Sequence, residues 1–199
     1  MPPFVTVAVE GIADEAVAGK LISLVGADMG AVYGKQGKSH LRQRLAGYNH
    51  AARHAPWLML VDLDRDADCA PPVLRAWLPN PAPMACLRVT VRAIEAWLIA
   101  DAESLAGYLG ISRNRIPEQP EGLDDPKAEM VNLARASRHR PIRQDMVPRD
   151  RSGRSVGPAY SSRLVEFIVG CWRPKVAAIR ADSLNRAIRA LRRLMETIA

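Results

Sequence analysis

The chain has little cysteine and histidine for a sequence of 199 residues. Its three cysteines are odd in number and widely scattered (Cys69, Cys86 and Cys171), so neither a disulfide framework nor a zinc cluster is indicated. None of the four histidines stands at a ligand spacing from a cysteine. His50 and His54 are one helical turn apart, but because a third ligand is missing we interpret them as surface residues.

Long apolar runs are also missing. No run approaches the roughly 18 residues of a membrane span, and the N-terminus has no basic-then-apolar signal pattern. The sequence therefore predicts a cytoplasmic protein that does not associate with membranes. A Gly-x-x-x-x-Gly-Lys phosphate loop is absent, because the glycines of residues 34–38 stand too close together. With 48% hydrophobic residues, a chain of this length can form one globular core, with or without an appendage.

Charge is distributed unevenly along the chain. Residues 135–199 hold 15 of the 28 basic and 5 of the 21 acidic residues, an excess of ten positive charges, whereas residues 1–134 have an excess of three negative charges. An acidic part joined to an arginine-rich part suits an enzyme for a polyanion. The alternative is that the arginines only solvate helix surfaces. The densest group is expected to bind phosphates without reading sequence: Arg138, Arg140, Arg143, Arg149, Arg151 and Arg154.

Strand and helix signals alternate through the first half of the chain. Apolar, β-branched runs predict strands over residues 4–9, 57–63 and 86–91, with a shorter strand within 26–34. Helical spacing predicts helices between and after them, over 13–25, 38–54, 71–78 and 92–100. This order predicts an α/β, Rossmann-like fold with a mostly parallel sheet and helices on both faces.

Beyond Asp101 the strand signals end. Helices are predicted near residues 102–109, 126–137, 160–172 and 183–198, and residues 138–158 are predicted as a long loop rich in Arg, Pro and Gly. We therefore expect an α/β core over residues 1–110 and a basic helical extension over residues 111–199, packed on that core.

Acidic residues follow the predicted strands. Asp62 and Asp64 come directly after an apolar run, and alternation along an extended chain would put both on the same side. Glu10 follows the first strand and Glu95 follows the last one. Because parallel strands end at a common edge, where ligands bind, these carboxylates are expected to converge. Two crowded carboxylates are stabilised by a cation with oxygen ligands, so Mg²⁺ or Mn²⁺ is expected here.

The motifs Val9-Glu10-Gly11-x-x-Asp14 and Val61-Asp62-x-Asp64 resemble those of a Toprim domain, the catalytic fold of topoisomerases, bacterial primases and OLD (overcoming lysogenisation defect) nucleases. Residues 92–101 (Arg-Ala-Ile-Glu-Ala-Trp-Leu-Ile-Ala-Asp), Pro126-Lys127, residues 156–160 and the closing helix at Ser183-Leu184 resemble a bacterial Toprim-like family of unknown function. The resemblance covers nearly the whole chain.

The resemblance implies roles for individual residues. Glu10 matches the Toprim glutamate, a metal ligand or general acid/base, and Asp62 and Asp64 match the paired aspartates that hold Mg²⁺. Asp14 and Glu95 match positions that hold a second metal in OLD nucleases. Lys127 is a looser match to a basic residue that steadies transition-state charge. Ala93 stands where those nucleases carry serine, which departs from a conventional two-metal site.

Simpler alternatives remain for three of these residues. Asp14 could complement the dipole of the helix that it begins, Glu95 could lie on an exposed helical stripe, and Lys127 could be an ordinary surface lysine.

The leading hypothesis is a metal-dependent nuclease acting on nucleic acid, with DNA favoured over RNA, as an effector in phage defence with an AAA- or ABC-type ATPase partner. The alternative is a non-catalytic partner module that binds such an ATPase and nucleic acid. A homodimer is compatible with either hypothesis.

Overall fold

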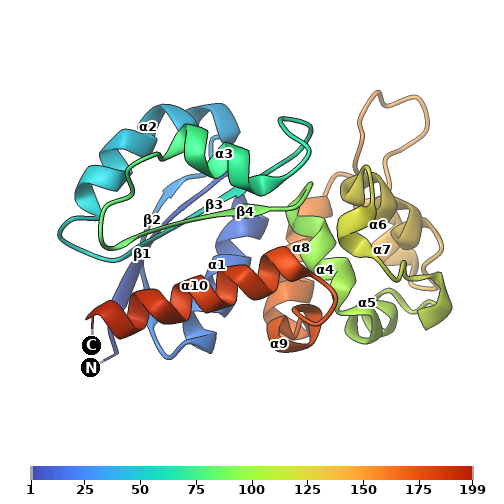
Figure 1. The fold of residues 1–199 in the computed structure, drawn as a ribbon. Coiled ribbons are helices and arrows are strands. Elements are labelled where there is room, and N and C mark those ends of the chain that lie inside the picture. Colours follow the sequence, from blue (N-terminus) through green and yellow to red (C-terminus); the bar gives the residue numbers. More distant parts are fainter. Residues whose placement is uncertain (1, 199) are drawn as a thin grey trace. The chain divides into compact units, whose positions relative to one another are not determined.

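The computed structural model describes residues 2–198, which form two units (Figure 1). The first unit comprises the chain up to Val91 together with the part from Ser183 onward, and the second comprises Arg92–Asp182. The chain therefore divides after Val91 rather than after residue 110, and the last helix returns to the first unit. No helix among the described residues combines the length and the apolar character needed to cross a bilayer.

The first unit is built on one sheet of four strands. These are β1 (Phe4–Val9), β2 (Asp28–Gly34), β3 (Trp57–Asp62) and β4 (Ala85–Thr90), in the order β2-β1-β3-β4. Every neighbouring pair is parallel. The five residues from Trp57 to Val61 are all buried, as expected for a strand covered on both faces. The prediction of an α/β, Rossmann-like fold with a parallel sheet is confirmed.

Helices cover both faces of this sheet. In Figure 1, α2 (Lys38–Ala51) and α3 (Ala70–Trp77) lie on one face, and α1 (Ile12–Leu24) and α10 (Asp182–Ile198) lie on the other. Apolar side chains of β1, β3 and β4 form one cluster with those of α2 and α3, among them Ala8, Leu41, Met59, Val73 and Leu87.

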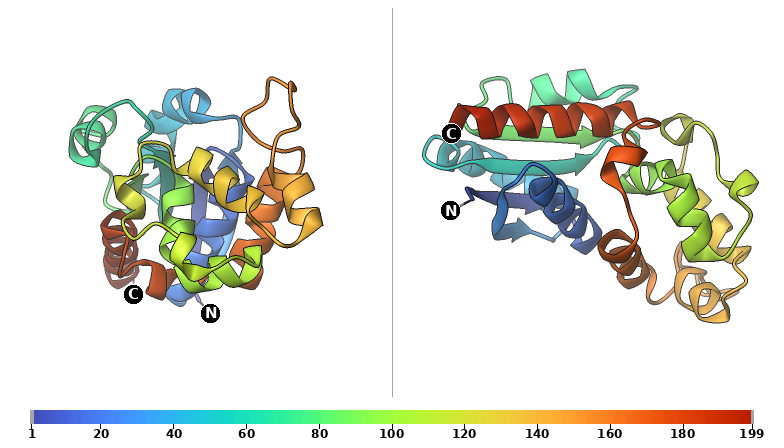
Figure 2. Two further views of the ribbon diagram at one scale, coloured as in Figure 1. Left: turned by 90° about the vertical axis from the view of Figure 1, so that its right-hand side faces the viewer. Right: turned by 90° about the horizontal axis from the view of Figure 1, so that it is seen from below.

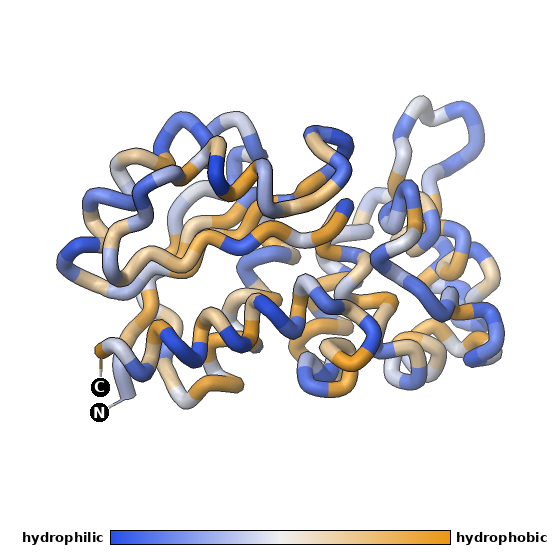
Figure 3. Tube along the Cα trace, viewed as in Figure 1, coloured by the Kyte–Doolittle hydropathy of each residue, from blue (hydrophilic) through white to orange (hydrophobic). Residues whose placement is uncertain are grey.

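The last helix packs through an apolar stripe along the sheet. Figure 2 shows α10 running beside β4, and Figure 3 shows hydrophobic and hydrophilic residues alternating along it. At its start, Oγ of Ser183 accepts a hydrogen bond of 3.4 Å from the backbone N–H of Val91. The stripe is buried at helical spacing and comprises Leu184, Ala187, Ile188, Leu191 and Leu194. Burial of this stripe explains why α10 belongs with the sheet.

The second unit is helical. It contains α4 (Ile94–Ala100), α5 (Ala102–Leu109), α6 (Pro126–Arg135), α7 (Arg140–Met146), α8 (Tyr160–Gly170) and α9 (Pro174–Ala177), with short 3₁₀ helices at Arg113–Arg115 and Pro120–Gly122. All seven residues of α4 are buried, so this helix forms the centre of the unit. Nε1 of Trp172 donates a hydrogen bond of 3.1 Å to the carbonyl of Trp97, which is itself fully buried.

The expectation of an uninterrupted loop over residues 138–158 is wrong, because this segment contains α7. Pro141 lies in the first turn, where proline is tolerated, and Ile142 and Met146 are buried one helical turn apart. The loop between α7 and α8 projects from the unit in Figure 1. Its far end is pinned to α7, since the N–H of Gly157 donates 2.9 Å to the carbonyl of Met146.

Candidate active site

The carboxyl ends of β1 and β3 lie side by side in the middle of the sheet. In the order β2-β1-β3-β4, the chain goes from β1 toward one edge and later from β3 toward the other edge. Ligands of parallel α/β sheets bind where the connections diverge in this way. Glu10 directly follows β1, and Asp62 is the last residue of β3, so both carboxylates stand at this point.

Glu10 and Asp62 are in direct contact. The backbone N–H of Asp62 donates a hydrogen bond of 2.9 Å to Oε1 of Glu10. The carboxylate of Asp62 is held in turn by Thr90, whose Oγ1 donates to Oδ1 of Asp62 at 2.5 Å. Thr90 is fully buried and stands opposite Asp62 in the pairing of β3 with β4. These three residues form one hydrogen-bonded row across the ends of three strands.

The loop after β2 closes over the end of β1. The N–H groups of Lys35 and Gly37 donate to the carbonyls of Val9 and Glu10 at 2.8 and 3.1 Å. Gly34 permits this approach, because a Cβ atom there would lie 2.2 Å from the carbonyl oxygen of Val9, and its φ is +89°. The loop delivers Lys38, the first residue of α2, to the same edge of the sheet as Glu10.

Lys38 neutralises two of the aspartates after β3. Its Nζ lies 2.9 Å from Oδ2 of Asp64 and 2.7 Å from Oδ2 of Asp66, and it donates a further hydrogen bond of 3.2 Å to the carbonyl of Leu63. Only 18% of the Lys38 side chain is exposed. Burial by itself lowers the pKa of Lys38, but the hydrogen bonds to Asp66 and Asp64 outweigh it and raise the pKa above its usual value. Lys38 is therefore a fixed positive charge.

The reason given from sequence for pairing Asp62 with Asp64 is wrong. Alternation requires an extended chain, but β3 ends at Asp62 and Asp64 has a left-handed backbone with φ of 51°. Asp62 therefore bonds to Thr90, whereas Asp64 turns to Lys38. Asp64 remains near Glu10, because its charge contributes to the pKa of that residue.

Glu10 holds its proton more strongly than an ordinary glutamate. Burial raises its pKa, and the charges of Asp64 and Asp66 add to this effect, while the hydrogen bond from Asp62 and the charge of Lys38 oppose it. A carboxyl with a raised pKa can exchange a proton nearer neutral pH. Glu10 therefore has the properties of a general acid or base.

Asp14 lies beside Glu10 in the first turn of α1. Its side chain is buried and folds back over Gly11, where an added Cβ would lie 3.3 Å from Oδ2 of Asp14. This position suits both explanations offered from sequence. It complements the positive end of the helix dipole, and it adds a further carboxylate near the end of β1.

The residues at this edge fit a divalent cation in their chemistry. Among residues 2–198, no three His, Cys, Asp or Glu side chains are already grouped as metal ligands. However, carboxylate oxygens are the ligands that Mg²⁺ and Mn²⁺ prefer, and Glu10 and Asp62 lie in contact. These two residues would hold the ion, with Asp64 as a further ligand once Lys38 exchanges away from it.

Glu95 and Lys127, also expected at the site, belong to the second unit. Glu95 is buried in α4, and the hydroxyl of Tyr160 donates a hydrogen bond of 2.9 Å to its Oε1. Nζ of Lys127 lies 5.9 Å from the centre of the Tyr160 ring. Burial raises the pKa of Glu95, while its backbone N–H, Tyr160 and Lys127 oppose this rise. Glu95 is therefore not on an exposed stripe, and it forms a buried group with Tyr160 and Lys127.

The six arginines expected to bind phosphates divide into two kinds. Arg138 donates its Nε to the carbonyl of Gly110 at 2.8 Å, and Nη1 of Arg143 donates to the carbonyl of Ser137, so both anchor the backbone around α7. The other four are exposed, at the start of α7 and in the loop after it: Arg140, Arg149, Arg151 and Arg154. Those four retain guanidinium groups that a polyanion can reach.

Comparison with protein-family models, with curated proteins and with solved structures finds no match for this chain. The Toprim resemblance therefore stays a prediction drawn from the motifs alone.

Sequence reasoning missed two residues of the edge, Lys38 and Thr90. Thr90 ends β4 and could have been found from the register of a parallel sheet, because strand ends meet at one edge. Lys38 could have been found from its place at the start of the helix that follows β2.

Proposed function

We propose that the chain is a metal-dependent nuclease that hydrolyses phosphodiesters of nucleic acid, with DNA favoured over RNA and with a cytoplasmic location. The observation that carries the proposal is the contact between Glu10 and Asp62 where the strand connections diverge. The acidic motifs that resemble Toprim nucleases support it, as do the exposed arginines around α7.

Each residue of the edge has a part in this proposal. Mg²⁺ or Mn²⁺, held by Glu10 and Asp62, would stabilise charge on the phosphate oxygens and promote ionisation of the attacking water. Glu10, with its raised pKa, would accept or return a proton. Thr90 fixes the carboxylate of Asp62 through its hydrogen bond. Lys38 reduces the negative charge of the edge, so that a polyanion can approach.

The test compares cleavage of plasmid, single-stranded DNA and RNA with Mg²⁺ or Mn²⁺. Glu10→Gln and Asp62→Asn should each lower the rate by about 10²-fold or more, the effect of losing an acid–base group. Asp68→Asn is the matched control, because Asp68 is an exposed residue of the same acidic run. Cleavage that persists in either site variant would refute the proposal.

A second candidate is a non-catalytic module that binds nucleic acid and an ATPase. The observation that favours it is that Lys38 already neutralises Asp64 and Asp66, so this part of the edge is stable without a metal ion. Calorimetry with Mg²⁺ and Mn²⁺ separates the candidates. Binding at millimolar concentration that is lost in Asp62→Asn supports the nuclease, and no binding supports the module.

A further inference from the structure

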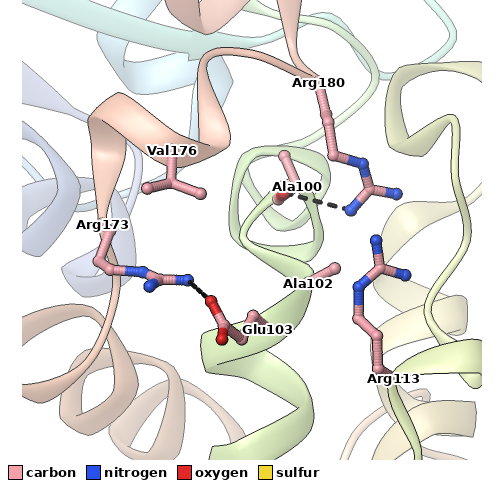
Figure 4. Close-up of a pocket in the computed structure, with 7 residues that line it drawn as sticks. All are labelled: Ala100, Ala102, Glu103, Arg113, Arg173, Val176 and Arg180. Atoms are coloured by element: carbon pink, nitrogen blue, oxygen red, sulfur yellow. Dashed lines mark hydrogen bonds and ion pairs between the residues drawn. The ribbon is translucent and has the colours of Figure 1, made fainter.

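A pocket of about 380 Å³ lies within the second unit, and it is independent of the acidic edge (Figure 4). It is formed by the end of α4, the start of α5, the 3₁₀ helix at Arg113–Arg115, and α9 with the residues around it. Its lining comprises Ala100, Ala102, Glu103, Arg113, Arg173, Val176 and Arg180. Three guanidinium groups and one carboxylate therefore line a space of the size that holds small molecules.

One of the three arginines is already neutralised. Nη2 of Arg173 lies 2.7 Å from Oδ1 of the fully buried Asp101 and 2.9 Å from Oε2 of Glu103. Its backbone N–H and Nε also donate to Asp101. The geometry commits Arg173 to closing one side of the pocket rather than to a ligand.

The other two arginines face each other without a carboxylate between them. Figure 4 shows the guanidinium groups of Arg113 and Arg180 pointing toward one another on the same side of the pocket. Nη1 of Arg180 donates 3.3 Å to the carbonyl of Ala100, and its Nη2 donates to the carbonyl of Pro117, so this guanidinium is held in place. Within residues 2–198, neither arginine forms a salt bridge.

The two positive charges act on each other. Burial lowers the pKa of Arg180 below its usual value, the charge of Arg113 lowers it further, and Glu118 opposes this effect. Two like charges fixed side by side are costly unless an anion joins them. A ligand with two negative charges would compensate both, whereas a phosphodiester carries only one.

We propose that this pocket binds the terminal phosphate of a small phosphate monoester, with Arg113 and Arg180 as its cationic ligands. A guanidinium donates two parallel hydrogen bonds to phosphate oxygens, and a terminal phosphate has three unesterified oxygens to share between two such groups. The volume exceeds that of a phosphate alone. Ala100, Ala102 and Val176 supply the apolar wall against which the organic part of the ligand lies.

The test is calorimetric titration of the full chain with inorganic phosphate, a nucleoside 5′-monophosphate and the corresponding nucleoside. We expect the monophosphate to bind at one site per chain, inorganic phosphate to compete with it, and the nucleoside not to bind. A charge-assisted hydrogen bond is lost in Arg113→Gln, so its dissociation constant should rise about tenfold or more. Absence of saturable monophosphate binding at millimolar concentration would overturn the proposal.

Two further variants guard against indirect effects. Arg115→Gln makes the same charge change on the same 3₁₀ helix, but Arg115 does not line the pocket, so binding should change less than about twofold. Equal weakening by Arg113→Gln and Arg115→Gln would show diffuse electrostatics instead of a site. Glu103→Gln removes the only lining carboxylate and should tighten phosphate binding, and weaker binding in this variant would also contradict the proposal.

Discussion

Tyr160→Phe tests how the buried carboxylate of Glu95 is held in the second unit. The substitution removes only the hydroxyl that donates 2.9 Å to Oε1 of Glu95, and it leaves the ring in place. Both side chains are buried, so water cannot replace the lost donor. A hydrogen bond to a charged group contributes about 1.5–3 kcal/mol. We expect the free energy of unfolding to fall by about 2 kcal/mol at neutral pH.

The effect should grow with pH. Because burial raises the pKa of Glu95, its favourable contribution is complete below the ordinary carboxyl pKa and is lost as the pH rises through the raised folded-state value. Tyr160 opposes that rise, so its removal should make the loss of stability steeper. In a Glu95→Gln background the amide is neutral, and the same substitution should cost only about 1 kcal/mol at any pH.

Urea unfolding of the four proteins of this cycle, followed by circular dichroism at about pH 4 and about pH 8, measures these terms. A loss of 2 kcal/mol corresponds to a midpoint shift of roughly 1 M urea. Tyr108→Phe is the control in the same unit, because its hydroxyl donates 3.1 Å to Glu166, which is exposed. Costs for Tyr160→Phe and Tyr108→Phe that are equal and independent of pH would refute the reasoning.

Three other substitutions test the acidic edge of the sheet. Gly34→Ala should destabilise the protein by roughly 2–4 kcal/mol, because its Cβ would collide with backbone at positive φ, whereas Gly47→Ala in the open middle of α2 should stabilise it by about 0.5–1 kcal/mol; thermal unfolding compares the two. Thr90→Val should leave the fold intact but lower nuclease activity by about 10–100-fold, since the carboxylate of Asp62 loses its donor; unchanged activity would exclude this positioning role. Lys38→Met should make the melting temperature rise more on addition of Mn²⁺ than that of the wild type does, because the cation then replaces the missing positive charge; equal shifts would argue against exchange between Lys38 and a cation.

Much of the fold is encoded in local patterns. The apolar runs at Phe4–Val9 and Trp57–Asp62 predict buried strands, and the alternation of strands with helices predicts a parallel sheet. The edge strand β2 has a weaker pattern, because Met29 and Tyr33 are exposed and glycines interrupt it. The helix α7 is short and rich in polar residues, so its two buried side chains gave too weak a periodicity.

The site was less predictable, because its contacts depend on distant residues and on backbone geometry. Glu10 and Asp62 could be placed together from the common edge of parallel strands. The left-handed turn at Asp64 could not be read from an Asp-x-Asp motif, and this turn decides that Asp64 meets Lys38. Tyr160 is 65 residues from Glu95, so no local pattern indicates their contact.

The charge at the edge of the sheet separates the two candidate functions. The carboxylates that follow β1 and β3 outnumber the one lysine there that pairs with them, since Lys38 reaches Asp64 and Asp66 but forms no salt bridge with Glu10 or Asp62. Glu10 lessens its own charge through a raised pKa, which suits proton transfer but leaves the edge repulsive to a phosphate backbone. A nuclease at this edge therefore requires a cation for its substrate to approach, whereas a binding module would use only the exposed arginines around α7. Dependence of nucleic-acid binding on Mg²⁺, together with loss of that dependence in Asp62→Asn, would follow from the first mechanism and not from the second.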